Sequence, residues 1–447
     1  MTLDWWLALC AWLPLPVLAW LARRVQGQWL APGALIALAW TLAAGVPLFL
    51  APDLPVFPGA YGFVLLVSSV CVLASTMGAS VEVRLPKAET TRAIEWPPRT
   101  WQLYYALIAI GCAAPVMLYG DATSATRAGD LAELAMYTSM GRYGGEYEIP
   151  TLVRLLTASS YVAATISGFV TSASAPKDRR WPRSIAWMLP LVMTVVIHTE
   201  KAGLLYGLVM FAAGWAAGRA LSRAPARRVK ATTILIVVVG IFVLLAFFVG
   251  AQSMRMNRVS LADIPFVLNH LRIYVVGHMP VFGHWWTHEY SRMTVEGFGT
   301  HTFAGMAELM GLTVRKAGLY DGSSGFTESN IYTAMRPLLE DFGLVGALAF
   351  MFVLAYGAGV GWRLLSLGRR LGAVPVVCFT AYVLWSPITS IFVYSTIIAV
   401  VLAFAAWTWW VDTSAVLEAR KNAASEALQG GSLAAVQLLV VRSGSSG

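Results

Sequence analysis

The chain has 447 residues, of which 58% are hydrophobic and only 12% are charged. Soluble domains carry roughly 25% charged residues, so this composition excludes an ordinary soluble protein and favours a polytopic membrane protein. The net charge of +9 does not indicate nucleic-acid binding, because the Lys and Arg residues lie in short loops between apolar runs.

Eleven apolar runs are predicted to cross a bilayer, which takes about 20 residues per helix. Two of them, Ile185–Ile197 and Ala373–Trp385, are short, so a re-entrant segment is the alternative for each. In chain order the eleven runs are Leu3–Ala22, Leu30–Leu50, Gly59–Ser80, Thr100–Tyr119, Thr151–Ser174, Ile185–Ile197, Ala202–Leu221, Thr232–Ala251, Tyr332–Leu365, Ala373–Trp385 and Ile388–Trp410.

The loops between these runs alternate in charge. Clusters such as Arg23-Arg24 and Arg369-Arg370 fall on one side, which the positive-inside rule makes cytoplasmic. We therefore predict an all-α fold with the N-terminus outside and the C-terminus inside. Residues 1–411 form one transmembrane domain, 412–442 a cytoplasmic tail, and the final 443–447 a linker.

Two outer loops are long, at residues 120–150 and 252–331. The second is not a hydrophilic linker, because residues 261–288 mix apolar side chains with Arg272 and several His. Such a segment is expected to form helices that lie in the membrane interface or fold back onto the bundle.

A second basic set lies on the outer side, where positive charge is unusual and is costly near lipid unless it is paired. A guanidinium group bonds phosphate oxygens in pairs, so the set predicts a pyrophosphate bound at the outer face. The alternative is that these residues pair with Glu296, Glu308, Glu328, Glu340 or Asp341. The set comprises Arg142, Arg154, Lys201, Arg255, Arg258, Arg272, Arg292, Arg315, Lys316 and Arg336.

Five of the six His residues lie in the second loop. His284 and His288 are four residues apart, which would let one helix face bind zinc, but no further ligand pair accompanies them and no metal is predicted. Interfacial anchoring beside Trp285 and Trp286 accounts for most of these residues. One His acting as a general base stays a hypothesis, since an ordinary pKa of about 6.5 suits neutral pH.

The stretch TESNIYTAMRPLLEDFGLVG, residues 327–346, resembles the segment that enters a late transmembrane helix in bacterial oligosaccharide repeat-unit polymerases of the Wzy type. The stretch RIYVVGHMPVFGHWW, residues 272–286, is similar to an apolar loop helix of the same family. Eleven spans and a large outer loop before the third-last span also fit. The matching positions are Asn330, Tyr332, Thr333, Arg336, Asp341, Phe342, Gly343 and Gly346.

The resemblance implies a type-C glycosyltransferase-like protein of the bacterial inner membrane, with its active site facing the periplasm. The donor and the acceptor would be undecaprenyl-pyrophosphate-linked oligosaccharides, joined with inversion into O-antigen or exopolysaccharide without a cofactor or an essential metal. A chain-length co-polymerase would be a candidate partner. Arg258, Arg272 and Arg336 would hold the diphosphate. Glu328 and His278 are the candidate bases, and the other candidate substrate-binding residues are Arg255, Lys201, Asn330 and Tyr332.

Two other functions compete with polymerisation. An O-antigen ligase would use the same chemistry with a lipid A–core acceptor, but that branch usually has His-Asn where this chain has Ser329-Asn330. A flippase for lipid-linked sugars would be expected to carry charges in mid-span and an internal repeat. The sequence shows neither feature, because its ionisable residues gather at helix ends.

Overall fold

The computed structural model describes residues 2–82, 96–126, 150–174, 181–198, 201–222, 231–255, 260–293, 295, 297–313 and 331–429. Within these ranges the chain forms helices and connecting turns and contains no strand. The predicted all-α, multi-pass membrane architecture is therefore confirmed.

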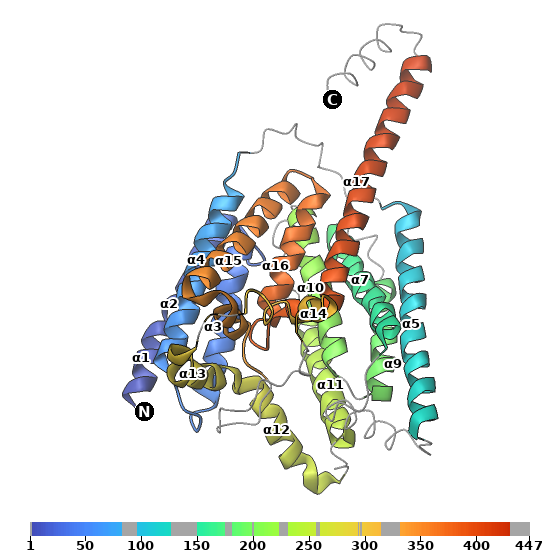
Figure 1. Ribbon diagram of the computed structural model, residues 1–447. Helices are drawn as coiled ribbons and strands as arrows, with labels where there is room; N and C mark the ends of the chain where they lie inside the picture. The colour runs from blue at the N-terminus through green and yellow to red at the C-terminus, as the bar shows by residue number, and fades with distance from the viewer. Residues whose placement is uncertain are drawn as a thin grey trace.

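The described elements are long helices interrupted by several short ones (Figure 1). They are α1 (Leu3–Trp12), α2 (Pro14–Gln26), α3 (Pro32–Leu50), α4 (Pro58–Ala79), α5 (Pro98–Thr126), α7 (Thr151–Ala173), α8 (Trp181–Ile185), α9 (Met188–His198), α10 (Lys201–Ser222), α11 (Ala231–Arg255), η2 (Leu261–Asp263), α12 (Ile264–Val276), α13 (His278–His288), η3 (Tyr290–Arg292), α14 (Ala304–Leu309), α15 (Met335–Ser366), η4 (Arg370–Gly372), α16 (Ala373–Trp385), η5 (Ile391–Val393) and α17 (Ser395–Gln429).

Eight helical segments of the described chain are long and apolar enough to cross a membrane. α1 and α2 together make the first, and α3, α4, α5, α7, α10, α15 and α17 supply the others. All eight coincide with runs predicted from the sequence.

The predicted count of eleven is not reached in the described residues, and two of the predicted runs form helices too short to cross a bilayer. α9 and α16 have 11 and 13 residues. At 1.5 Å per residue they are roughly 16 and 20 Å long, against a hydrocarbon core of about 30 Å. The third run lies in α11, which has 25 residues and whose side chains are described only in part, including the apolar Phe242–Ser253.

The helices pack in two groups that meet at α10, α15 and α16 (Figure 1). One group holds α1 to α4 with α15, and the other holds α5, α7, α9, α10 and α17. Glycines allow two helix pairs to approach closely. Between α7 and α10, a Cβ atom on Gly168 or Gly214 would collide with a carbonyl oxygen of the facing helix. Between α4 and α15, a Cβ atom on Gly78 or Gly359 would do the same. Small residues of this kind let membrane helices approach closely.

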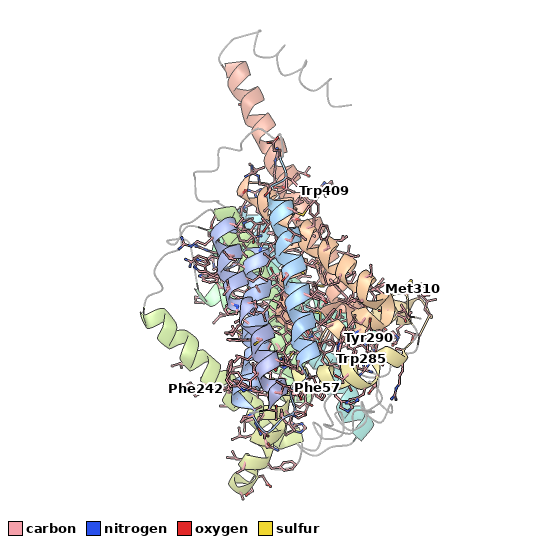
Figure 2. The ribbon with its side chains drawn as sticks, turned by 90° about the vertical axis from the view of Figure 1, so that its left-hand side faces the viewer. Phe57, Phe242, Trp285, Tyr290, Met310 and Trp409 are labelled. Atoms are coloured by element: carbon pink, nitrogen blue, oxygen red, sulfur yellow. The ribbon has the colours of Figure 1, made fainter. Side chains whose placement is uncertain are left out.

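The described parts of the long loop before α15 form short helices, of which α12 and α13 lie at the lower end of the bundle in Figure 1. α13 packs against α4 and buries residues from His278 to Gly283 together with Trp285, so it folds back onto the bundle as predicted. α12 exposes Phe266, Leu268 and Val275, apolar side chains that suit the membrane interface. Figure 2 shows Trp285 and Tyr290 together at this end, while Phe242 of α11 lies apart from them.

α16 and α17 meet inside the bundle rather than at a membrane surface. The turn between them, residues 386–394, has Ser386, Ser390 and Ile391 fully buried. This arrangement fits the re-entrant alternative for Ala373–Trp385. α17 then continues past its apolar part, Ser395–Ser414, and projects from the opposite end of the bundle.

Candidate functional site

The head of α15 brings polar residues into the bundle. Thr333, Arg336, Glu340 and Asp341 are all buried there, as is Tyr332 just before them. The residues just before α15 are hydrogen-bonded to the turn after α16. The backbone N–H groups of Tyr332 and Thr333 donate to the Ile388 carbonyl at 3.1 and 3.2 Å. A buried, charged helix head of this kind is costly, and such groups in membrane proteins are usually functional.

α15 is interrupted at Gly343, which has φ 62° and ψ −174°. This conformation is essentially restricted to glycine, because a Cβ atom is not tolerated there. The sequence predicted one continuous span over Tyr332–Leu365. The break instead separates a polar head, up to Phe342, from the apolar helix that follows, and so lets the two parts take different directions.

Arg336 is held by a carboxylate and two aromatic rings. Its Nε donates to Glu340 Oε1 at 2.7 Å, and their side chains are only 9% and 3% exposed. The guanidinium carbon lies 5.2 Å from the centre of the Trp285 ring and 5.1 Å from that of Tyr332. The alternative in which outer Arg residues pair with Glu340 is thus confirmed for Arg336, and the rings add cation–π attraction.

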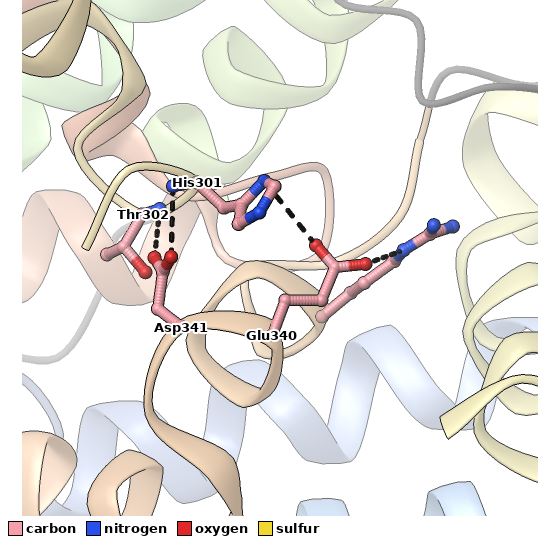
Figure 3. Close-up of polar contacts among 5 residues, drawn as sticks. His301, Thr302, Glu340 and Asp341 are labelled. Atoms are coloured by element: carbon pink, nitrogen blue, oxygen red, sulfur yellow. Dashed lines mark hydrogen bonds and ion pairs between the residues drawn. The ribbon is translucent and has the colours of Figure 1, made fainter. Parts of the chain in front are cut away.

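Glu340 and Asp341 face a loop from a distant part of the chain (Figure 3). Glu340 Oε2 lies 3.9 Å from Nδ1 of His301. The Asp341 carboxylate accepts backbone hydrogen bonds from His301 at 3.1 Å and Thr302 at 2.5 Å. A Cβ atom on Gly297 would collide with Asp341 Oδ1, so glycine is what allows the loop to approach. Asp341 therefore holds the backbone at His301, while Glu340 lies near its imidazole ring.

Two further predicted site residues have other partners. Arg272 of α12 pairs with Asp53, and both side chains are partly exposed. The hydrogen bond from Arg272 is the main reason that the pKa of Asp53 lies below its usual value. His278, the predicted base, is buried and its Nε2 lies 2.9 Å from the Ala43 carbonyl of α3, which accepts the hydrogen bond. His278 is thus enclosed by protein and occupied by a backbone hydrogen bond.

The remaining predicted site residues are not seen in atomic detail. Glu328, Arg258 and Asn330 lie outside the described residues, and of Arg255 and Lys201 only the backbone is described, at the end of α11 and the start of α10. Of the predicted set, the structure therefore brings together Arg336 and Tyr332. His301 and Glu340 join them, although the sequence interpretation gave neither a catalytic role.

His278 gives the folded state a specific pH dependence. Burial lowers its pKa from 6.5 to about 4, against the opposing effect of hydrogen bonds to the Ala43 and Val275 carbonyls. Between pH 6.5 and 4, His278 is therefore protonated in the unfolded chain but not in the folded chain. The contribution of His278 to the free energy of unfolding is therefore complete above pH 6.5. It falls by up to about 3 kcal/mol as the pH drops from 6.5 to 4.

The prediction can be checked with His278→Gln, which keeps an N–H donor but does not titrate. The free energy of unfolding should fall less between pH 7 and 4.5 in this variant than in the wild type. His288→Gln, at an exposed position, is the control for removing a histidine from α13. Equal pH dependence in His278→Gln and wild type would contradict the assignment.

The described residues contain no complete set of ligands for a metal ion. The His284 and His288 rings do lie together, with centroids 4.6 Å apart, and both meet the edge of Phe57. No group of three or more His, Cys, Asp or Glu residues is arranged to hold an ion within the part of the chain that the structure describes.

No protein-family model, curated protein or solved structure matches this chain. The site is therefore interpreted from its own chemistry. Arg336 contributes one positive charge, Glu340 and Asp341 contribute two negative charges, and His301 offers an imidazole that is 46% exposed. This combination suits proton transfer from a polar substrate better than the binding of an anion by itself.

Proposed function

We propose that the protein is an inner-membrane glycosyltransferase that joins undecaprenyl-pyrophosphate-linked oligosaccharide repeat units at the periplasmic face. The observation that carries the proposal is the buried head of α15. The residues that resemble the polymerase motif, Tyr332, Arg336 and Asp341, are the ones that form a polar cluster with an outer loop. A type-C glycosyltransferase architecture is part of the same proposal.

Arginine residues would stabilise the leaving diphosphate in this mechanism. Negative charge develops on the departing oxygen as the C1–O bond breaks, and fixed cations favour that state. Arg272 and Arg336 are both oriented by a carboxylate, Asp53 and Glu340 respectively. The pair with Asp53 is partly exposed, so a diphosphate would have to compete with an ion pair that contributes little in water. Arg258 is proposed as the third ligand.

The test is polymerisation by the purified protein. Lipid-linked repeats extracted from a deletion strain, which should accumulate single-repeat glycolipid, are supplied as both donor and acceptor. We expect a ladder of longer glycans that persists in EDTA, because arginine rather than a metal balances the diphosphate. Arg272→Ala should lower the rate markedly, since fixed donors to a developing oxyanion are each worth about 100-fold or more.

Arg292→Ala is the matched control, because Arg292 is an exposed arginine of the same outer segment. It should retain wild-type activity, and Arg272→Lys should recover part of the rate, since lysine keeps the charge but lacks the planar fork. Loss of activity in EDTA with recovery on adding zinc would contradict metal independence. Absence of any new glycosidic bond in the wild-type reaction would overturn the proposed function.

Ligation to lipid A–core is the second candidate, because it uses the same leaving group and the same proton transfer. Supplying lipid A–core as the acceptor separates the two functions, since a polymerase should leave it unmodified. A flippase is disfavoured because Arg336, Glu340 and Asp341 lie in the first turns of α15, beside outer-loop residues, rather than in the middle of the span.

A further inference from the structure

We propose that His301 is the general base of the glycosyl transfer and that Glu340 is the positioning residue behind it. The inference rests on the proposed function and adds to it the group that removes the acceptor's proton. It replaces the two bases expected from the sequence, of which His278 is enclosed and Glu328 lies outside the described residues.

The His301 ring spans from a buried carboxylate to an accessible surface. Its Nδ1 lies 3.9 Å from Glu340 Oε2, while 46% of the His301 side chain is exposed against 3% for Glu340. The distance is that of an ion pair and longer than a hydrogen bond, and such contacts often tighten only when the substrate binds. A carboxylate in this place stabilises the imidazolium that forms when the ring accepts a proton.

The loop that carries His301 is held in position before any substrate arrives. Asp341 binds the backbone N–H groups of His301 and Thr302, and the Thr302 carbonyl accepts from Ser390 of the turn after α16 at 3.4 Å. A base fixed on such a support needs little reorganisation during the reaction. The charged groups that the described structure places beside the ring are Glu340 and Asp341, with Arg336 bonded to Glu340.

The other histidines of this loop have different surroundings in the described contacts. His278 is hydrogen-bonded to the α3 backbone, and His284 and His288 face each other beside Phe57. His270 lies against the ring of Tyr274, with centroids 5.1 Å apart. His301 is the one for which a contact with a buried carboxylate is seen in the part of the chain that the structure describes.

The proposed step balances without a further reactant. A sugar hydroxyl of the acceptor attacks C1 of the donor sugar, and its proton passes to a ring nitrogen of His301. The new C1–O bond forms as the old bond to the diphosphate breaks, and the diphosphate leaves with that electron pair. The imidazolium, stabilised by Glu340, then returns its proton to the solvent or to the released diphosphate.

The test uses the purified full-length protein and lipid-linked repeats extracted from a deletion strain. We expect His301→Gln to lower kcat by about 100- to 10,000-fold, the range for losing a general base. The KM for the lipid-linked repeats should change little, and His288→Gln should behave as the wild type.

A second variant separates chemistry from folding. Added imidazole should restore part of the rate to His301→Ala, which a purely structural role would not allow. The proposal is overturned if His301→Gln keeps more than about a tenth of wild-type kcat, or if imidazole fails to rescue a His301→Ala protein that elutes and unfolds like the wild type. Failure of the wild type to extend the repeats would instead overturn the proposed function.

Discussion

Replacing Arg336 with Ala is expected to destabilise the protein by about 3–5 kcal/mol, the range for breaking a buried ion pair by removing one partner. The cost arises because Glu340, with a side chain that is 3% exposed, keeps its charge in a place that water does not reach. Unfolding of the purified protein by SDS titration would measure this loss. The Trp285 and Tyr332 rings also lose the cation between them.

The double variant Arg336→Met/Glu340→Gln is the control for this explanation. It removes both charges at similar volume, and such replacements of buried pairs are often neutral or stabilising. We expect it to regain most of the lost stability but no polymerising activity, because it removes both a proposed diphosphate ligand and the carboxylate behind His301. If Arg336→Ala alone is as stable as the wild type, the buried pair does not hold the head of α15 together.

The membrane-spanning part of the fold was largely predictable from hydropathy. All eight spans seen in the structure were present as apolar runs, because each crosses on its own stretch of chain. The two short runs show what hydropathy does not measure. An apolar run such as Ala373–Trp385 can turn back inside a bundle, where Ser386 and Ser390 are buried among protein rather than lipid.

The candidate site was predictable only where its contacts are local. Arg336 and Glu340 are four residues apart on one helix, a spacing at which side chains meet, and the pair was among the expected alternatives. His301 and Asp341 are 40 residues apart, so their contact depends on how the outer loop folds over α15. Sequence alone offered five loop histidines and no means of choosing the one that meets a carboxylate.

The break at Gly343 divides a stretch that hydropathy reads as one span. Hydropathy averages over a window and does not register a single residue with φ 62°. Because regular helix geometry is interrupted there, the residues before it can belong to a polar site while the residues after it continue as an apolar helix. A glycine between a charged stretch and an apolar run was the available signal, although it does not specify the direction of the turn.

Replacing Asp341 with Ala is expected to have the second large effect. Its carboxylate is 1% exposed and accepts the backbone N–H groups of His301 and Thr302. Each buried donor left without a partner costs about 1–3 kcal/mol, so the variant should lose about 2–6 kcal/mol of unfolding free energy. The free energy of unfolding of Asp341→Asn should lie between those of the wild type and Asp341→Ala. Its amide oxygen accepts one hydrogen bond, while its NH₂ group faces the second N–H donor.

In these variants the rate of glycan extension should fall by more than the loss of unfolding free energy explains, because a loop that is no longer held cannot keep His301 beside Glu340.

Gly297→Ala tests the same contact from the loop, since its Cβ would collide with Asp341 Oδ1. Gly357→Ala on α15 is the matched control, because nothing lies within 4 Å of a Cβ there. We expect Gly297→Ala to cost about 1–3 kcal/mol, as overpacking usually does, and to reduce the rate of glycan extension. Wild-type rates in both Gly297→Ala and Asp341→Asn would mean that the loop is not positioned by Asp341 for the reaction.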